Sequence, residues 1–411
     1  MMFNNYERNK QMNKQLFREH GVSTDIVELL TDAQIEHLDK AIKRYRQNGA
    51  EKKPKLDVIA LHRFNMPKNS SLPILEELLV DHNKLYSSDL ENVLCTPTPT
   101  GKFEKGIYAI IGKEIFKQKE DIENFPTVRL ESTGQVKVLS ELILGEFVIA
   151  DLIRAANFAS NDCLRPAMCQ VMLASEKGRL VIASTDGHRL FHKETTVRFP
   201  SNESYLIPTK LTYFLSKVQM RNATLQHLLH TVKTDTQNIV DGKKEDGFIE
   251  TPYVRVLLDN DVTYTSKVCS EKYPDYKSIM PTEAEVLYTV DRKELLRTVQ
   301  YCEQFASAAT RLVAFHVAPA APKIWEISAE DIDFGKSIKK DFPLVKSEKV
   351  KKPFYSKRSA LLMPVRINAN GPGCFGFNAE YLKDVLRALT TEHVIISQKS
   401  MESAHIFSEV N

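Results

Sequence analysis

The sequence predicts an α+β protein assembled from three copies of one structural unit. Two observations carry this prediction. The same order of parts recurs along the chain, and runs of alternating apolar residues typical of strands are separated by segments with helical spacing. The chain has 411 residues, enough for several ordinary domains. Its hydrophobic content of 42% and charged content of 27% are those of a globular protein.

Each copy of the unit contains an apolar strand-like run, a short polar turn, and a second strand that closes on an aspartate. The closing aspartates are Asp89, Asp186 and Asp331. The short turns indicate that the two runs of each copy form an antiparallel hairpin. In chain order the runs are Ser71–Leu79 with Lys84–Glu91, Leu164–Leu173 with Arg179–Arg189, and Thr310–Ala318 with Lys323–Asp333.

Helices are expected on both sides of the second and third hairpins. Phe147–Phe158 and Tyr288–Tyr301 precede the hairpins and carry apolar residues at i, i+3 and i+4. Tyr205–Val218 and Gly376–Leu389 follow them, with a proline or an asparagine where each helix begins. The first copy is shorter and lacks an obvious second helix.

These patterns predict four segments. They are an N-terminal helical extension (1–55), a shortened first unit (56–144), a second unit (145–282), and a third unit (283–411) with an insertion near 346–370. Within the extension, Ser23–Asn48 is expected to be helical. The extension is either a solvated appendage or a helix that contacts a partner or DNA through basic residues, namely Lys40, Lys43, Arg44 and Arg46.

Several classes of protein are disfavoured by what the sequence lacks. It has no Gly-rich phosphate loop, no GxSxG motif and no HExxH motif. Its six cysteines contain no CxxC pair, which fits free thiols in a reducing compartment. No apolar run reaches the ~18 residues of a transmembrane helix. The net charge is only +3, so any contact with nucleic acid must depend on local placement of cations.

The stretch Ala183–Phe191, ASTDGHRLF, places Asp, His and Arg around a glycine and raises the question of an active site. His188 and His192 lie in a strand-like run, where four residues separate side chains by about 13 Å, too far to share a metal ion. Asp-Gly is a turn-forming pair, and no set of nucleophile, base and orienting group surrounds it. The residues alone therefore favour a turn with an exposed polar rim.

Four stretches in register resemble the bacterial-type DNA polymerase sliding clamp, the β subunit of DNA polymerase III. The resemblance spans roughly 56–411 and is carried by Ser71–Glu91, Leu180–Leu190, Lys272–Pro281 and Gly376–Leu389. It implies three DNA-clamp domains per chain, with sheets outside and helices lining a pore, in a ring of two chains around double-stranded DNA. It implies a non-catalytic cytoplasmic processivity factor for a DNA polymerase, without metal, cofactor or membrane.

The resemblance also implies a groove that binds short peptides of the polymerase and the clamp loader, with the turn at Asp186 as one wall. Apolar positions would bury peptide anchors, and polar positions would orient the peptide. The matched positions are Arg165, Thr185, Gly187, His188, Arg189, Leu190, Pro274, Ile279, Asn378 and Tyr381.

A pore that lets DNA slide needs long cations that contact phosphates without reading bases, so sequence-nonspecific binding is expected. We expect these cations on the paired helices of the second and third units. The candidates are Arg154, Lys210, Lys217, Arg221, Arg297, Lys383 and Arg387. The alternative is that they belong to solvated helix faces.

Relatives in this family end in a strand that lines the groove, and this sequence has no such strand at its end. Leu361–Arg366, LLMPVR, is the same kind of sequence but lies inside the insertion. A strand's place in a sheet is set by pairing and not by chain order. We therefore predict that this segment replaces the terminal strand, with Met363, Pro364 and Val365 at the groove floor.

Two other functions stay open at the level of sequence. A repeat scaffold that binds proteins without forming a ring would show an open ring or a neutral pore. A nucleotide-processing enzyme using Asp186, His188 and Arg189 would need a phosphate cradle or a metal cluster, and the sequence has neither.

Overall fold

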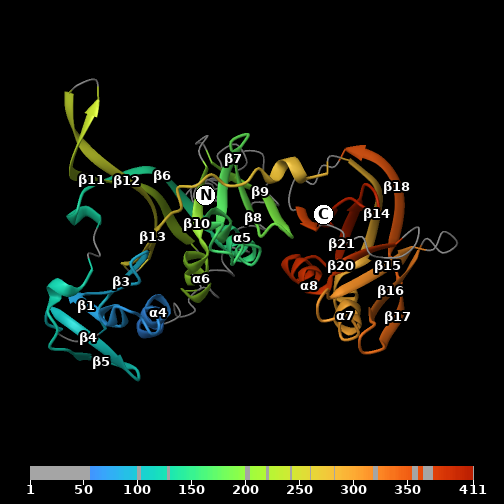
Figure 1. Ribbon diagram of the computed structural model, residues 1–411, viewed down its shortest axis with the longest axis horizontal. Helices are drawn as coiled ribbons and strands as arrows, with labels where there is room; N and C mark the ends of the chain where they lie inside the picture. Colours follow the sequence, from blue (N-terminus) through green and yellow to red (C-terminus); the bar gives the residue numbers. More distant parts are fainter. Residues whose placement is uncertain are drawn as a thin grey trace, which may run out of the picture. The chain divides into compact units, whose positions relative to one another are not determined.

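The computed structural model describes residues 56–99, 103–126, 130–199, 204–218, 222–240, 243–259, 261–281, 283–317, 323–353, 360–363 and 374–410. The predicted N-terminal extension and its helix lie outside these residues. Val58–Asn411 form one compact body. The described part is an α+β protein with five α-helices and three antiparallel sheets (Figure 1).

The first unit is a single sheet covered by one helix. Its strands bury residues on both faces: Leu79, Tyr86 and Ile107 pack on one face, and Leu78 and Leu85 pack on the other, where partly buried side chains from the helix join them. The elements are α4 (Val58–Asn65), β1 (Leu78–Asp81), β2 (Lys84–Ser88), β3 (Asn92–Pro97), β4 (Gly106–Ile111) and β5 (Glu114–Lys117).

The second unit has two sheet portions and two helices that pack against each other. Its first strand, β6, pairs with β11, so the structure groups β6 with the second unit, although the predicted segment 56–144 would leave most of it in the first. The elements are β6 (Gln135–Gly145), α5 (Glu146–Ala156), β7 (Gln170–Glu176), β8 (Arg179–Thr185), β9 (Leu190–Arg198), β10 (Ser204–Pro208), α6 (Thr209–Val218), β11 (Asn222–Val240), β12 (Lys243–Leu258) and β13 (Val262–Lys267).

The third unit repeats this order and adds two strands. Its core is aromatic: Trp325 is fully buried and contacts Phe315 and Phe375 edge-on. The elements are β14 (Glu283–Asp291), α7 (Arg292–Glu303), β15 (Leu312–Val317), β16 (Ile324–Asp331), β17 (Lys336–Pro343), β18 (Lys346–Pro353), β19 (Ala360–Met363), β20 (Cys374–Asn378), α8 (Ala379–Ala388), β21 (His393–Gln398) and β22 (His405–Glu409).

Two of the three sheets continue from one unit into the next. The first has the strand order β5-β4-β1-β2-β3-β13-β12-β11-β6, so β13 of the second unit extends the sheet of the first. The second has the order β10-β7-β8-β9-β19-β22-β21-β14-β18, so β19 joins the second unit to the third. The third sheet, β17-β16-β15-β20, leaves β17 as an edge strand among the described residues.

The predicted hairpins and helices are present, with two systematic differences. Three of the four predicted helical runs begin with residues of a strand, β10, β14 or β20, and their helices start three or four residues later. The other difference lies at the first strand of the first two hairpins. The runs predicted as strands begin with short 3₁₀ helices, Pro73–Glu76 and Pro166–Cys169, and the strands start only afterwards. Each 3₁₀ helix has proline in its first turn, where the missing N–H has no partner to lose. Apolar content alone does not distinguish this start from a strand.

The hairpin of β11 and β12 was not predicted. These strands span 19 and 16 residues, whereas β21 and β22, which also follow a second helix, span 6 and 5. Pairing with β6 ends at Thr231, so the rest is a two-stranded arm (Figure 1). Phe248 and Ile249 on this arm are exposed.

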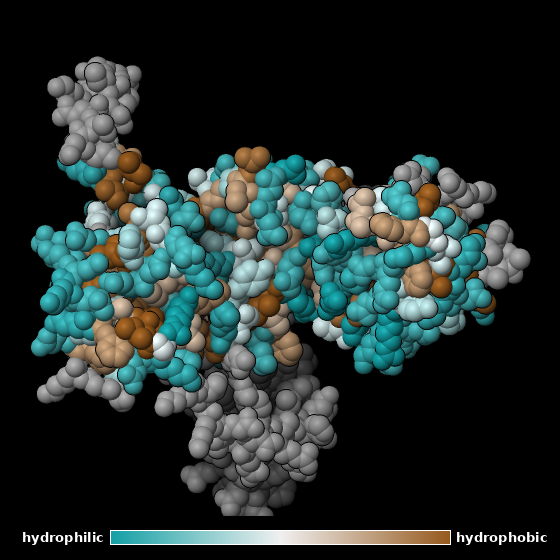
Figure 2. All heavy atoms as spheres, turned by 60° about the horizontal axis from the view of Figure 1, so that its bottom comes forward, coloured by the Kyte–Doolittle hydropathy of each residue, from teal (hydrophilic) through white to brown (hydrophobic). Residues whose placement is uncertain are grey.

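The face in Figure 2 is largely hydrophilic, and its apolar side chains form separate spots. Scattered exposed apolar residues are normal on a protein surface. Any interface of this molecule should therefore depend on local geometry, such as strand edges and turns.

Candidate functional site

The turn between β8 and β9 is built by the side chains of its own residues. Asp186 Oδ1 accepts hydrogen bonds from the backbone N–H groups of His188 at 2.8 Å and Arg189 at 2.9 Å. Gly187 has a φ of +86°, a conformation that side chains rarely adopt. Thr185 Oγ1 accepts from the Gly187 N–H and donates to the Arg189 carbonyl. Asp186 therefore shapes a turn.

The first unit contains the same turn between β2 and β3. Asp89 Oδ1 accepts from the N–H groups of Glu91 at 3.0 Å and Asn92 at 2.6 Å. Asp89 and Asp186 thus cap the two turns with the same offsets in sequence. This repeated geometry explains the recurring aspartates without a catalytic role.

Several predicted groove residues surround the turn at Asp186. A Cβ added at Gly187 would lie 3.6 Å from Arg165 Nη1 and 3.7 Å from Met168 Cε, so both side chains lie against the turn. Met168 was not predicted; its place two residues after Pro166, in the 3₁₀ helix that faces the turn, is the signal that could have identified it. Leu190 is 1% exposed and therefore contributes to the core, leaving little surface for a ligand.

The segment after β13 supports the turn from the other side. The Tyr273 hydroxyl accepts a hydrogen bond from the Thr185 N–H at 2.9 Å, and burial raises the pKa of Tyr273 to about 12, which keeps the hydroxyl neutral. The Tyr276 ring contacts the His192 ring. Pro274 and Ile279 are exposed beside these anchors, with Ile279 58% exposed. An apolar rim is thus available to a ligand.

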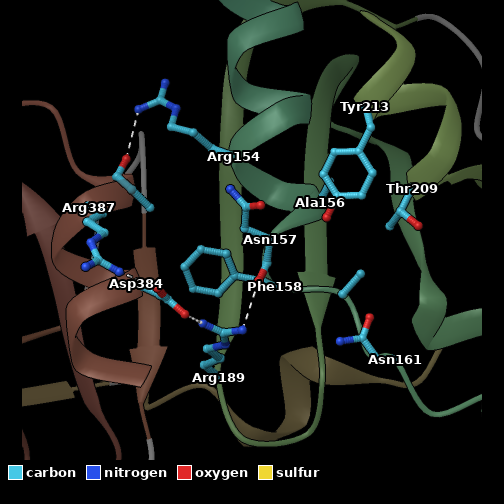
Figure 3. A pocket seen from close by; sticks show the side chains of 12 residues that line it. Arg154, Ala156, Asn157, Phe158, Asn161, Arg189, Thr209, Tyr213, Asp384 and Arg387 are labelled. Carbon is cyan, nitrogen blue, oxygen red and sulfur yellow. Dashed lines mark hydrogen bonds and ion pairs between the residues drawn. The ribbon is translucent and has the colours of Figure 1, made fainter. Parts of the chain in front are cut away.

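Arg189 joins three elements (Figure 3). Its guanidinium pairs with Asp186 at 3.0 Å and with Asp384 on α8, and it donates to the Asn157 carbonyl at the end of α5 at 2.9 Å. It also lies over the rings of Phe158 and Tyr381, 5.1 and 5.2 Å from their centroids. The side chain is only 11% exposed. Arg189 therefore ties the second unit to the third.

The first turn of α8 completes the wall. Asn378 caps this helix by accepting from the N–H groups of Glu380 and Tyr381, and its amide donates to the Thr310 carbonyl. Asn378 therefore positions the helix. The Tyr381 ring is stacked on the exposed His188, with 5.4 Å between centroids and 16° between planes.

The segment Leu361–Arg366 is described only as far as Met363. Ala360–Met363 form β19, which pairs with β9 on one side and β22 on the other; Leu362 is the partner of Leu190 and of Ile406. β19 therefore brings the third unit into contact with the second unit beside the turn at Asp186. Pro364 and Val365 lie outside the described residues.

The predicted cationic residues differ in solvent exposure and in ion pairing. Lys217, Arg297 and Arg387 are exposed. Arg154 pairs with Asp151 and donates to the Ala388 carbonyl, Lys210 pairs with Asp89, and Lys383 pairs with Glu303. Arg221 lies outside the described residues. Arg154, Arg189 and Arg387 line a cavity of about 300 Å³ (Figure 3). Each has a carboxylate partner, but Arg387 keeps 53% of its side chain exposed.

The junction of the first and second units contains a buried polar network. His62 on α4 is fully buried and its ring nitrogens contact the Ser87 and Thr96 hydroxyls at 2.8 and 2.9 Å. Burial lowers the pKa of His62 to about 3, so the ring stays neutral. The Tyr264 hydroxyl on β13 donates to Asn65, which carries the network into the second unit.

No group of three or more His, Cys, Asp or Glu side chains within the described ranges is placed to hold a metal ion. No helix in these ranges is long and apolar enough to cross a membrane.

Comparison with known proteins relates this architecture to a group of replication proteins. No family model matches the chain. The beta sliding clamp of Bacillus subtilis is 26% identical over 222 residues, which are 53% of this chain and 52% of the relative. The beta sliding clamp of Pseudomonas putida is 23% identical over 289 residues, 70% of this chain and 65% of the relative. The chain is a divergent homologue of the bacterial beta sliding clamps.

Solved structures show the same fold. The DNA polymerase III beta subunit of Thermotoga maritima has a TM-score of 0.62 at 15% identity and covers 86% of this chain and 96% of its own. The DNA polymerase sliding clamp of Bacillus subtilis has a TM-score of 0.60 at 17% identity with the same coverage. In sequence, the chain spans about half the length of the first beta sliding clamps that it matches.

Proposed function

We propose that the protein is a non-catalytic DNA sliding clamp, in which two copies form a closed ring around double-stranded DNA in the cytoplasm and tether a DNA polymerase. The homology to beta sliding clamps supports this proposal. The three units, at 56–144, 145–282 and 283–411 apart from the exchange of β6, would then be the three clamp domains of each copy.

The observation that carries the ring is the pair of unfilled strand edges. At each internal junction, the last strand of one unit's hairpin, β3 or β9, pairs with a strand of the following unit, β13 or β19. β17 is the strand of the third unit that corresponds to β3 and β9. β5 resembles β13, because each is the second strand of a tight hairpin and is followed by an aromatic residue and a proline, Phe125-Pro126 or Tyr273-Pro274. Both outer edges are unpaired in the part of the chain that is described.

The surroundings of the two edges include exposed groups of opposite charge. Lys336, Lys339 and Lys340 on β17 face solvent, whereas acidic residues (Glu120, Asp121 and Glu123) follow β5. Exposed apolar side chains lie beside both edges; they are Ile332 (82% exposed) and Phe334 (74%) near β17, and Ile111 (61%) and Phe116 (45%) near β5. A head-to-tail pairing of β17 with β5 of a second copy buries these groups and closes a two-fold ring.

Solution mass and retention on DNA test the ring together. A closed ring is a dimer at micromolar concentration and stays on nicked circular DNA but slides off linear DNA. A monomer, or equal retention on both forms, favours the ring-less scaffold. The first unit has only one helix within the described residues, whereas the others have two, which favours a weaker closure.

The interface itself is tested with Ile332→Glu/Phe334→Glu. Placing two carboxylates at this apolar turn should shift the protein to monomer, with at least a tenfold weaker dimer. Phe147→Glu, which changes an 85% exposed phenylalanine on α5, is the control and should leave the dimer intact.

Within the ring, Lys217, Arg297 and Arg387 are the cations best placed for phosphate contact, because they are exposed on α6, α7 and α8. Arg387 also pairs with Asp384, but 53% of its side chain stays exposed. Arg154, Lys210 and Lys383 have structural partners and a smaller expected role. Replacing the three exposed residues by glutamate should weaken loading onto DNA and flatten the dependence of loading on salt.

The peptide groove for polymerase and clamp loader is proposed at the turn of Asp186. Its exposed residues are His188, Arg165, Pro274 and Ile279, and Tyr381 beside them is half-buried. Met363, Pro364 and Val365 are assigned to its floor from sequence. Apolar rims with a few polar groups are typical of peptide-binding sites.

A further inference from the structure

We propose that Asp384 is a positioning residue for the peptide groove: it ties α8 to Arg189, and this pair sets the stacking of His188 on Tyr381 that forms one aromatic wall of the groove. This inference rests on the proposed peptide-binding function. Asp384 lies on α8 in the third unit, and the groove turn lies in the second.

The donors of Arg189 are directed at the protein. Nε donates to Asp186, Nη1 to Asp384, and Nη2 to the Asn157 carbonyl. Three of its five N–H donors are therefore used in fixed directions. With 11% of the side chain exposed, Arg189 acts on the turn more than on a bound peptide.

Asp384 is the partner that comes from another unit. Asp186 and Asn157 belong to the second unit, as Arg189 does, and would hold Arg189 even if the third unit shifted. Charge-assisted hydrogen bonds are the stronger ones, so the Arg189–Asp384 pair fixes where α8 lies against the turn. Arg387 pairs with the other oxygen of Asp384 at 3.2 Å and restrains the carboxylate.

The stacking of His188 on Tyr381 depends on the position of α8 relative to the turn. Tyr381 and Asp384 are one helical turn apart on α8, so a shift at Asp384 moves the Tyr381 ring as well. His188 directly precedes Arg189 in the turn. The 5.4 Å stack of His188 on Tyr381 therefore reports how α8 sits on the turn, and it presents one continuous aromatic wall to a ligand.

The test uses Asp384→Asn in the full chain, with Asp384→Glu as the variant that keeps the carboxylate. Glu380→Gln is the matched control, because Glu380 lies on the same helix and pairs with Arg311, away from the turn. Binding is measured by fluorescence anisotropy with a labelled short peptide that carries leucine and phenylalanine side chains, which suit the apolar rim of Pro274 and Ile279 and the aromatic stack. The His188 ring is followed by NMR of ¹³Cε1-labelled histidine, assigned with His188→Gln, because a stacked tyrosine shifts its resonance upfield.

We expect Asp384→Asn to weaken peptide binding about tenfold and to reduce the upfield shift of His188. Asp384→Glu should restore most of both, and Glu380→Gln should change neither. The inference is overturned if Asp384→Asn keeps the affinity and the shift, or if Glu380→Gln loses as much. If the unmodified protein binds no peptide, the proposed groove fails, and the His188 shift still decides whether Asp384 positions the wall.

Discussion

At the junction of the first and second units, the turn after β2 supplies a carboxylate, Asp89, and α6 supplies the cation, Lys210. At the junction of the second and third units, the turn after β8 supplies the cation, Arg189, and α8 supplies the carboxylate, Asp384. The two junctions use the same parts with opposite charges. The arrangement of turn and helix repeats along this chain, but the charges that pair across each junction differ from one junction to the next.

The joining strands differ as well. β13 follows β12 directly in the chain and pairs with β3, whereas β19 precedes β20 and reaches β9 from within an insertion. Both pairings are antiparallel and place a strand of the later unit beside the last strand of the earlier hairpin. Pairing has been kept while chain order has changed, as hydrogen bonding between strands allows.

The largest effect is expected from breaking the joining strand of the second junction. Leu362→Pro removes a backbone donor from a strand that is paired on both sides, which should cost more than about 3 kcal/mol and open the contact between the second and third units. Hydrogen exchange should then show loss of protection in β9 and β22 while β3 stays protected. Equal protection in β9 before and after the change would show that β19 does not hold this junction.

A smaller effect is expected at the first junction. Lys210→Glu places a second carboxylate against Asp89, which is 16% exposed, and should reduce the free energy of unfolding by about 2 kcal/mol. Lys217→Glu on the same helix is the control, since Lys217 is exposed over the Phe64 ring, and should cost under about 0.5 kcal/mol. Urea unfolding of the two variants measures the difference; similar midpoints would mean that the Lys210–Asp89 pair adds nothing specific.

The dependence on pH should sharpen the comparison further. Burial lowers the pKa of His62 to about 3 and that of His405 to about 4, whereas an unfolded histidine titrates near 6.5. The unfolded chain therefore binds protons that the folded chain does not, so stability falls as the pH drops below 6.5. Each histidine should remove about 2 kcal/mol between pH 7 and pH 5.

Unfolding at both pH values separates the two histidines. His62→Gln should weaken the dependence of stability on pH that is measured by probes near the first junction. His405→Gln should weaken the dependence measured by probes near β19, because His405 is paired with Met363 in the sheet. If neither variant changes the slope, other groups dominate acid unfolding.

Much of the fold could be predicted because it depends on local patterns. The hairpins at Asp89 and Asp186 and the helices α5 to α8 follow from turn residues and helical spacing. The arm of β11 and β12 was missed although its strands are consecutive and pair from Val240 and Lys243 outward, with the turn-forming sequence Asp-Gly between them. The pairing of Arg189 with Asp384 spans 195 positions and has no local signature, so the contact between units could not be predicted from the sequence.

The reversed charges also bear on how a chain with similar units avoids folding incorrectly. If the turn at Asp89 met α8, the helix position of Lys210 would hold Glu380, and two carboxylates would repel. If the turn at Arg189 met α6, the helix position of Asp384 would hold Phe214, which offers no carboxylate to the guanidinium. Each wrong pairing is therefore disfavoured relative to the native one. The charge of one side chain at each turn thus favours packing against the correct helix during folding.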